Sequence, residues 1–150
     1  MNFSHPVFHS LSKLVVALCF LGLFANLNAA SVGLATGSPK VSIPFYDERR
    51  ATIAVDVAIE NSSDQAETVF VEIVLKDADG NEVARAEAGL EVAAGAQRAT
   101  AQWMNFKRPK VWTEENPYLY TAHTMVLRGT DVIDSSKSSF GVGSAAHSGE

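Results

Sequence analysis

Regular alternation of apolar and polar residues is the feature that most constrains the fold of this chain. Two segments, 52–59 and 68–76, place an aliphatic residue at every second position. Successive side chains of a β-strand point to opposite faces, so each segment predicts a strand with one buried side. The side chains predicted to face inward are Ile53, Val55, Val57 and Ile59 in the first segment and Val69, Val71, Ile73 and Leu75 in the second.

Four further segments are predicted as strands, with turn residues between them. They are 82–88, whose alternating charge suits a sheet edge, and 97–106, 118–127 and 131–140. In 97–106 we expect Trp103 to be the largest buried anchor, and in 118–127 we expect Tyr120, Ala122, Thr124 and Val126 to face inward. We find no amphipathic helix of useful length. Short strands separated by turns predict an all-β fold, an antiparallel β-sandwich of about seven strands.

The N-terminal thirty residues have the pattern of a secretory signal peptide. Residues 14–24 are uninterrupted apolar residues, follow Lys13 and precede small residues at 28–30. This run is shorter than the roughly 20 residues that span a bilayer. We therefore predict a signal peptide at 1–30, cleaved near Ala29 or Ala30, with an uncleaved anchor as the alternative. The expected location is periplasmic or extracellular, without stable membrane insertion after cleavage.

The expected organisation of the remaining chain is a flexible leader at 31–39, the sandwich at 40–144 and a disordered tail at 145–150. The chain has one cysteine, Cys19, which excludes a disulfide framework and a Cys-rich zinc site. Twelve Lys and Arg against 17 Asp and Glu give a net charge of −5. Phosphate backbones require clustered cations, so we expect no nucleic-acid partner.

Two pairs of acidic side chains are candidates for catalytic or metal-binding groups. Glu114 and Glu115 are adjacent, but their place beside a proline predicts an exposed turn. Asp77 and Asp79 precede Gly80 at a spacing unlike that of an EF-hand loop, which predicts a hairpin turn. We expect no catalytic residue, no metal site and no cofactor in this chain.

The remaining polar candidates are explained more simply. His123 lies within a predicted strand on the side opposite Tyr120, and His147 lies in the tail, so neither predicts a zinc site. The serines at 135, 136, 138 and 139 have no G-x-S-x-G context. The sequon Asn61-Ser62-Ser63 has meaning only in a eukaryotic secretory route.

Four aromatic residues allow two interpretations. Trp103, Trp112, Tyr118 and Tyr120 either stack on sugar rings or close the ends of the sandwich. We favour the structural role, with Tyr118 or Tyr120 acting as a tyrosine corner. Contact with a neighbouring domain is a third role for Trp112.

Residues 111–120, VWTEENPYLY, resemble the "LWSPENPxLY" segment of glycoside hydrolase family 2. Residues 132–135 and 140–144 resemble the "VxDS…FGFRS" strand of that family, with Val142-Gly143 in place of its Phe-Arg. Upstream, 54–61 resembles its "v.v.i.N" strand, and 79–84 its "DxdGxxVa" hairpin. The similarity runs over about 40–144, in the order of the family.

The resemblance implies an immunoglobulin-like sandwich, the accessory domain that holds the catalytic barrel and the sugar-binding domain together. Family members include β-galactosidases, β-glucuronidases and β-mannosidases, and their two catalytic glutamates lie in the barrel. We therefore expect this chain to be inactive alone, as a truncated product or one part of a split enzyme. Its expected partner is a barrel or sugar-binding domain encoded elsewhere. The alternative is a free-standing exported module that binds a glycan or a protein; a purely structural domain is a third possibility, because fold does not fix function.

Overall fold

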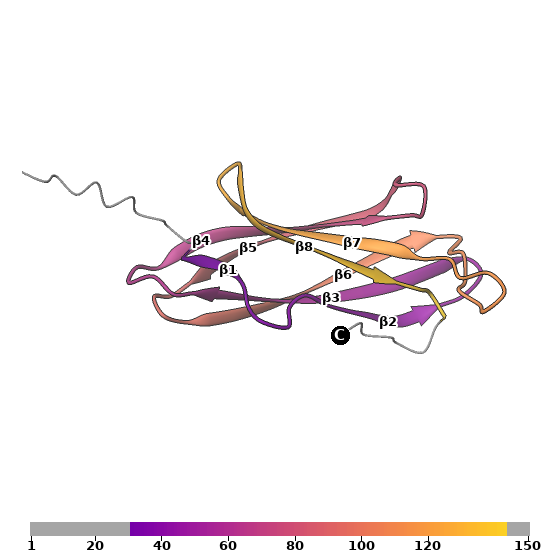
Figure 1. The fold of residues 1–150 in the computed structure, drawn as a ribbon, viewed down its shortest axis with the longest axis horizontal. Helices are drawn as coiled ribbons and strands as arrows, with labels where there is room; N and C mark the ends of the chain where they lie inside the picture. The colour runs from indigo at the N-terminus through magenta and orange to yellow at the C-terminus, as the bar shows by residue number, and fades with distance from the viewer. Residues whose placement is uncertain (1–30, 144–150) are drawn as a thin grey trace, which may run out of the picture.

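The computed structural model describes residues 31–143, which form eight β-strands in two layers (Figure 1). The predicted signal peptide, its cleavage site and the tail at 145–150 lie outside the described residues. Within 31–143 there is no helix long and apolar enough to cross a membrane. The strands are β1 (Val32–Leu34), β2 (Lys40–Tyr46), β3 (Arg50–Asn61), β4 (Glu67–Lys76), β5 (Glu82–Val92), β6 (Gln97–Lys107), β7 (Tyr120–Arg128) and β8 (Asp131–Phe140).

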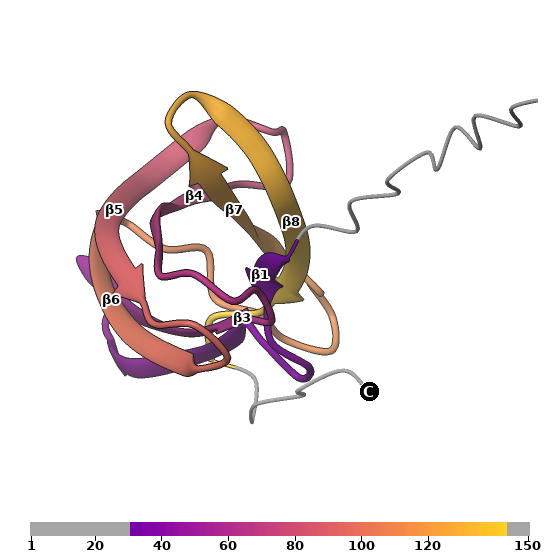
Figure 2. The same cartoon turned by 90° about the vertical axis from the view of Figure 1, so that its left-hand side faces the viewer.

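The strands form two antiparallel sheets that face each other, as the end-on view in Figure 2 shows. In the first sheet β6 lies on one side of β3, while β1 and β2 both pair with the other side. The second sheet has the order β5-β4-β7-β8. The predicted antiparallel sandwich is therefore confirmed. Eight strands replace the expected seven or so because β1 and β2 are two parts of one interrupted edge.

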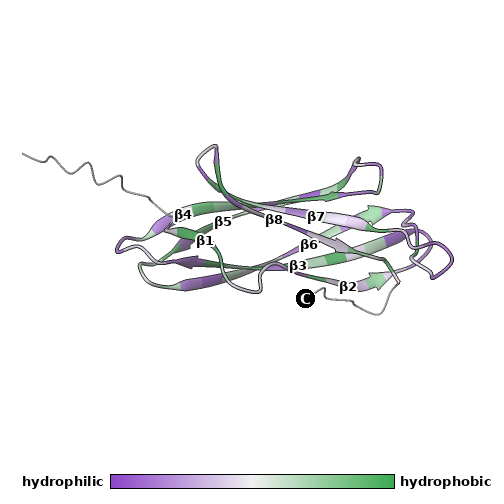
Figure 3. Cartoon of the chain, viewed as in Figure 1, coloured by the Kyte–Doolittle hydropathy of each residue, from purple (hydrophilic) through white to green (hydrophobic). Residues whose placement is uncertain are grey.

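The alternation in the sequence correctly identified the buried side of the two central strands. The eight aliphatic residues predicted to face inward from β3 and β4 all have no exposed surface. Hydrophobic and hydrophilic residues follow one another along the strands in Figure 3. Tyr120, Ala122, Thr124 and Val126 also face inward, as predicted. Each fully buried Val or Ile contributes roughly 1.5–3 kcal/mol, so this aliphatic layer stabilises the sandwich without a disulfide.

The predicted flexible leader at 31–39 was wrong. Residues 32–34 form β1, which pairs with the end of β3, and Val32 is completely buried. The backbone N–H of Leu34 also donates to Oδ2 of Asp134 in β8, at 2.8 Å. The sandwich therefore begins at Val32 and not at Lys40, because a short edge strand needs only one buried side chain and a few backbone hydrogen bonds.

Trp103 was also assigned to the wrong face. Its side chain is 62% exposed, on the outer face of the β3–β6 pair. The neighbouring inward positions of β6 belong to Gln102, Met104 and Phe106, all of which are buried. Side chains alternate between the two faces of a strand. Gln102 and Met104, which flank Trp103, both point inward, so Trp103 points outward despite its hydrophobicity.

Candidate functional site

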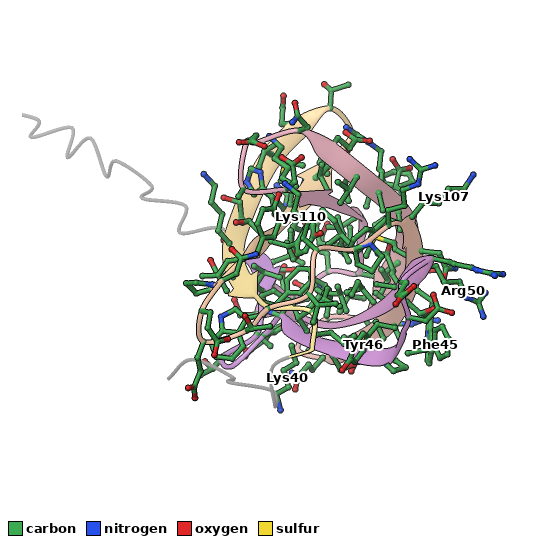
Figure 4. The ribbon with its side chains drawn as sticks, turned by 90° about the vertical axis from the view of Figure 1, so that its right-hand side faces the viewer. Lys40, Phe45, Tyr46, Arg50, Lys107 and Lys110 are labelled. Carbon is green, nitrogen blue, oxygen red and sulfur yellow. The ribbon has the colours of Figure 1, made fainter. Side chains whose placement is uncertain are left out.

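The loop between β6 and β7 is held firmly at one end of the sandwich, the end that faces the viewer in Figure 4. The hydroxyl of Tyr120 accepts a hydrogen bond from the backbone N–H of Lys110, at 2.8 Å. The hydroxyl of Tyr118 accepts one from the N–H of Ala78, at 3.2 Å. Tyr120 therefore makes the upstream backbone contact expected of a tyrosine corner, while Tyr118 ties the loop to the β4–β5 turn.

Tyr120 is the centre of an aromatic cluster beneath this loop. Its ring centroid lies 4.9 Å from that of Phe106, 5.1 Å from Tyr118 and 5.7 Å from Phe140. Burial raises the pKa of the Tyr120 phenol above its ordinary value, opposed by the hydrogen bond from Lys110. Lys110 also places its ammonium 4.5 Å from the centroid of Tyr118. Tyr118 and Tyr120 therefore have the structural role that we favoured for them.

The loop and the end of β8 are joined to each other. Val111 forms a parallel bridge with Val142, and the N–H of Trp112 donates to the carbonyl of Val142 at 2.7 Å. A Cβ atom on Gly141 would lie 2.8 Å from Cβ and Cγ of Trp112, closer than real contacts allow. Glycine at 141 is therefore required for the half-buried Trp112 to pack against the chain.

An apolar patch lies beside this junction, and we call it the end surface. It comprises Tyr46 of β2 (45% exposed) and Val111 of the β6–β7 loop (38%). Leu119 (47%) is another exposed apolar residue of the same loop. The end of the described chain also meets it, because a Cβ on Gly143 would lie 2.7 Å from Val111 and 3.5 Å from the Tyr46 ring. Large exposed apolar side chains grouped in this way are typical of a contact with another protein.

The acidic candidates occupy turns, as predicted. Glu114 and Glu115 are exposed within a turn closed by backbone hydrogen bonds between Thr113 and Asn116, at 3.1 and 3.2 Å. Oδ1 of Asp77 accepts hydrogen bonds from the N–H groups of residues 79 and 81. The Asn81 side chain, by hydrogen bonding, is the main cause that lowers the pKa of Asp77. Residues 31–143 contain no group of three or more potential metal ligands.

The other polar candidates also have local explanations. His123 is partly buried on the outer face of β7, where desolvation, followed by repulsion from Lys137 and Lys76, lowers its pKa. His147 lies outside the described residues. The four serines considered as nucleophiles all belong to β8. Ser135 and Ser139 are exposed, and Ser136 and Ser138 are partly buried.

Asn61 of the sequon is a structural residue that the sequence did not reveal. It is completely buried, and its Nδ2 donates to the carbonyls of Gln65, Val92 and Ala93, at 2.8, 3.0 and 3.3 Å. Its Oδ1 accepts from the N–H and the hydroxyl of Ser63. The amide nitrogen that a glycan would occupy is therefore used to join the β3–β4 turn to the end of β5.

The fold and this end of the domain define a class of protein: an immunoglobulin-like sandwich whose β6–β7 loop is hydrogen-bonded to the segment that follows the last strand. Comparison with known proteins identifies the family: the model of the glycosyl hydrolases family 2 matches residues 38–142. The chain belongs to this family.

Individual relatives agree with the assignment. The chain is 35% identical over 94 residues to a β-galactosidase, BoGH2A, of Bacteroides ovatus, covering 63% of this chain and 11% of that protein. It is 24% identical over 117 residues to a β-glucuronidase of Formosa agariphila, covering 68% and 12%. A solved family 2 structure from Bacteroides cellulosilyticus superposes with a TM-score of 0.72 at 23% identity, covering 75% and 15%.

The chain thus spans about a tenth of the length of the curated relatives it matches. What it shares with them is one small domain of a much longer enzyme. This confirms the resemblance on which the accessory-domain interpretation was based.

Proposed function

We propose that this domain is a non-catalytic scaffold that positions the catalytic domain of a glycoside-hydrolysing enzyme. The observation that carries the proposal is the fastened junction, in which the β6–β7 loop, the end of β8 and the end surface form one unit. A domain that orients a neighbour needs a rigid attachment and an apolar contact area beside it. The sandwich supplies both at the same end.

The reaction of the whole enzyme is proposed to be hydrolysis of a terminal β-glycosidic bond. The relatives that match the chain are named β-galactosidase and β-glucuronidase, and they support a sugar substrate of this class. Double displacement requires two carboxyl groups roughly 5–5.5 Å apart across the scissile bond. Glu114 and Glu115 are solvent-exposed residues of a turn, so we assign the acid and the nucleophile to the partner domain.

The proposed partner is therefore a catalytic barrel or a sugar-binding domain, contacted through the end surface. We also propose that the chain is exported, with residues 1–30 removed near Ala29 or Ala30. Sequencing of the N-terminus of the protein recovered from its host tests this step. A mature chain that retains Met1 would contradict it.

A chimera tests the scaffold role. In the Bacteroides ovatus relative, the matching segment is replaced by residues 38–142 of this chain, and hydrolysis of a chromogenic β-galactoside is measured. We expect a soluble, active chimera, whose activity falls when Val111→Asp or Tyr46→Asp places a charge in the end surface. Val132→Asp, an exposed apolar position on β8, is the matched control and should have no effect. A folded chimera that is inactive, or that tolerates Val111→Asp, would contradict the proposal.

The isolated chain is expected to release no chromophore from β-galactosides or β-glucuronides. Turnover by the pure protein that Glu114→Gln or Glu115→Gln abolishes would show that the domain is itself catalytic. The alternative function, a binding module, is favoured by one observation, the exposure of Trp103.

A further inference from the structure

The outer face of the β3–β6 pair combines an exposed aromatic ring with small and polar neighbours. Trp103 lies opposite Ala54, and Ser42 of β2 is paired with Ala54 on its other side. The next pair along this face is Thr52 and Asn105, and the one before is Asp56 and Ala101. Short side chains around the indole leave its ring open to a flat ligand, with hydroxyl, amide and carboxylate groups at its margins.

The polar group nearest along β6 is already oriented. The hydroxyl of Thr52 donates to Oδ1 of Asn105 at 2.6 Å. This bond fixes the amide of Asn105 and leaves the two hydrogens of its Nδ2 available to an external acceptor. A pyranose ring offers the complementary chemistry, because it has an apolar C–H face that packs on indole and hydroxyl groups around its edge.

The same face continues into a cleft that is lined mainly by apolar atoms, from side chains that include three basic residues. Arg49, Arg50, Asn105, Phe106 and Lys107 line a cleft of about 400 Å³. Arg50 and Lys107 lie opposite each other, one pair beyond Thr52 and Asn105, and both are labelled on the same side of Figure 4. At about 3.3 Å per residue, Lys107 is about 13 Å along the strand from Trp103, a distance that a short oligosaccharide spans.

Among residues 31–143 the cations of this cleft form no ion pair within 4 Å, but Asp47 lies near two of them: backbone hydrogen bonds from Arg50 and Arg49, and then the charges of these two side chains, lower the pKa of its carboxyl. The ion pairs within 31–143 join Arg85 and Arg128 to glutamates, and none includes Arg49, Arg50 or Lys107. Arg50 instead lies 4.8 Å from the ring centroid of Phe45. Asp47 in the same turn accepts hydrogen bonds from the backbone N–H groups of both arginines. Three basic residues line this cleft beside the Asp47 carboxylate, and in a chain of net charge −5 such a local grouping of cations favours an anion.

The geometry points to a binding site for an acidic oligosaccharide on the β3–β6 face, with one sugar ring stacked on Trp103 and a carboxylate or sulfate of a following sugar at Arg50 and Lys107. Asn105 contacts the hydroxyl groups between them. This activity goes beyond the scaffold role, because it gives the domain a ligand of its own. It uses a face of the sheet different from the end surface.

Calorimetric titration of the full chain with three tetrasaccharides tests the site. The probes are tetragalacturonate, a sulfated dextran tetrasaccharide and uncharged maltotetraose. We expect binding of an acidic probe that weakens with added NaCl, since surface charges are screened. Binding of the carboxylated or of the sulfated probe alone identifies the anionic group. Equal binding of maltotetraose, or failure of both acidic probes at millimolar concentration, would overturn the assignment.

Variants separate the two parts of the site. Trp103→Ala should raise Kd about tenfold or more, and Trp103→Phe should retain part of the affinity. Arg50→Gln with Lys107→Gln should weaken binding similarly and remove its salt dependence. Lys137→Gln and Val132→Ala, on β8, are matched controls expected to bind normally, and circular dichroism checks that each variant is folded. If Trp103→Ala leaves acidic-sugar affinity unchanged, or instead dissociates a protein complex without any sugar binding, the site is not a glycan site.

Discussion

Asn61 provides the sharpest test of how this sandwich is held together. Its side chain makes three hydrogen bonds of 3.0 Å or less to backbone groups, those of Gln65, Val92 and Ser63. Asn61→Ala removes all three inside a completely buried site. At a net loss of about 1 kcal/mol per bond, the free energy of unfolding should fall by about 3 kcal/mol. With an m-value of ~1.5 kcal/mol/M, the urea midpoint should fall by about 2 M.

Asn61→Asp separates hydrogen bonding from side-chain volume. It keeps the acceptor for Ser63 but replaces the donating nitrogen with an oxygen that faces carbonyl groups. Burial should raise the folded-state pKa of this carboxyl above its unfolded value of about 3.9, so the folded state binds more protons. The stability of the variant should therefore decrease as pH rises from about 4 towards neutrality, relative to the wild-type protein.

Urea unfolding followed by circular dichroism at two pH values measures both effects. Asn105→Ala, an exposed asparagine with one side-chain hydrogen bond, is the control and should cost well under 1.5 kcal/mol. The reasoning is refuted if Asn61→Asp unfolds at the wild-type urea concentration near pH 7, or if its pH profile is parallel to that of the wild-type protein.

Four other perturbations have defined outcomes. Tyr120→Phe removes the hydrogen bond from Lys110 and should lower stability by about 1–2 kcal/mol; the exposed Tyr46→Phe should have little effect, and equal thermal midpoints for the two would contradict the corner. The raised pKa of Tyr120 means that its folded form retains the proton longer, so stability should fall as pH rises beyond the ordinary tyrosine value; an absorbance titration should contain a late-ionising phenol that Tyr120→Phe removes. Gly141→Ala forces Cβ into Trp112 and should cost about 1–3 kcal/mol, with a change in Trp112 emission measured in a Trp103→Phe background; unchanged emission and stability would exclude the close packing. The lowered pKa of His123 means that the unfolded chain binds its proton more readily, so stability should increase with pH up to about the ordinary histidine value, and His123→Gln should flatten this part of the profile. Asp134→Ala removes the acceptor for Leu34 and should expose 31–39 to protease; a cleavage rate equal to that of Ser135→Ala would argue against this contact.

The long strands could be predicted because their residues alternate strictly. Ile53 to Ile59 and Val69 to Leu75 repeat every second position, and no turn residue interrupts them. β1 and β2 could not be recognised in this way. β1 has three residues, and in β2 the pairing register shifts between Ser42 and Phe45, so neither shows a sustained period. Their conformation is imposed by the free edge of β3.

The candidate site was only partly accessible to sequence reasoning. The turn at Asp77 and the tyrosine corner follow from local residue chemistry, and both were predicted. The cleft beside Arg50 and Lys107 was missed because the two residues lie 57 positions apart and become neighbours only through the β3–β6 register. For Trp103, the signal was the alternation of β6: Met104 and Phe106 are buried, so Trp103, one position before Met104, has to lie on the outer face.

The break between β1 and β2 also affects how this protein behaves in a crowded solution. Where the edge is interrupted, Ala58 remains fully hydrogen-bonded: its carbonyl accepts from the N–H of Ala35, and its own N–H donates to the hydroxyl of Ser38. An intruding β-strand from a second molecule would therefore find these backbone groups already occupied. Closing this gap in the sheet margin removes one site at which a strand of another molecule could pair edge to edge, the first step towards a fibril.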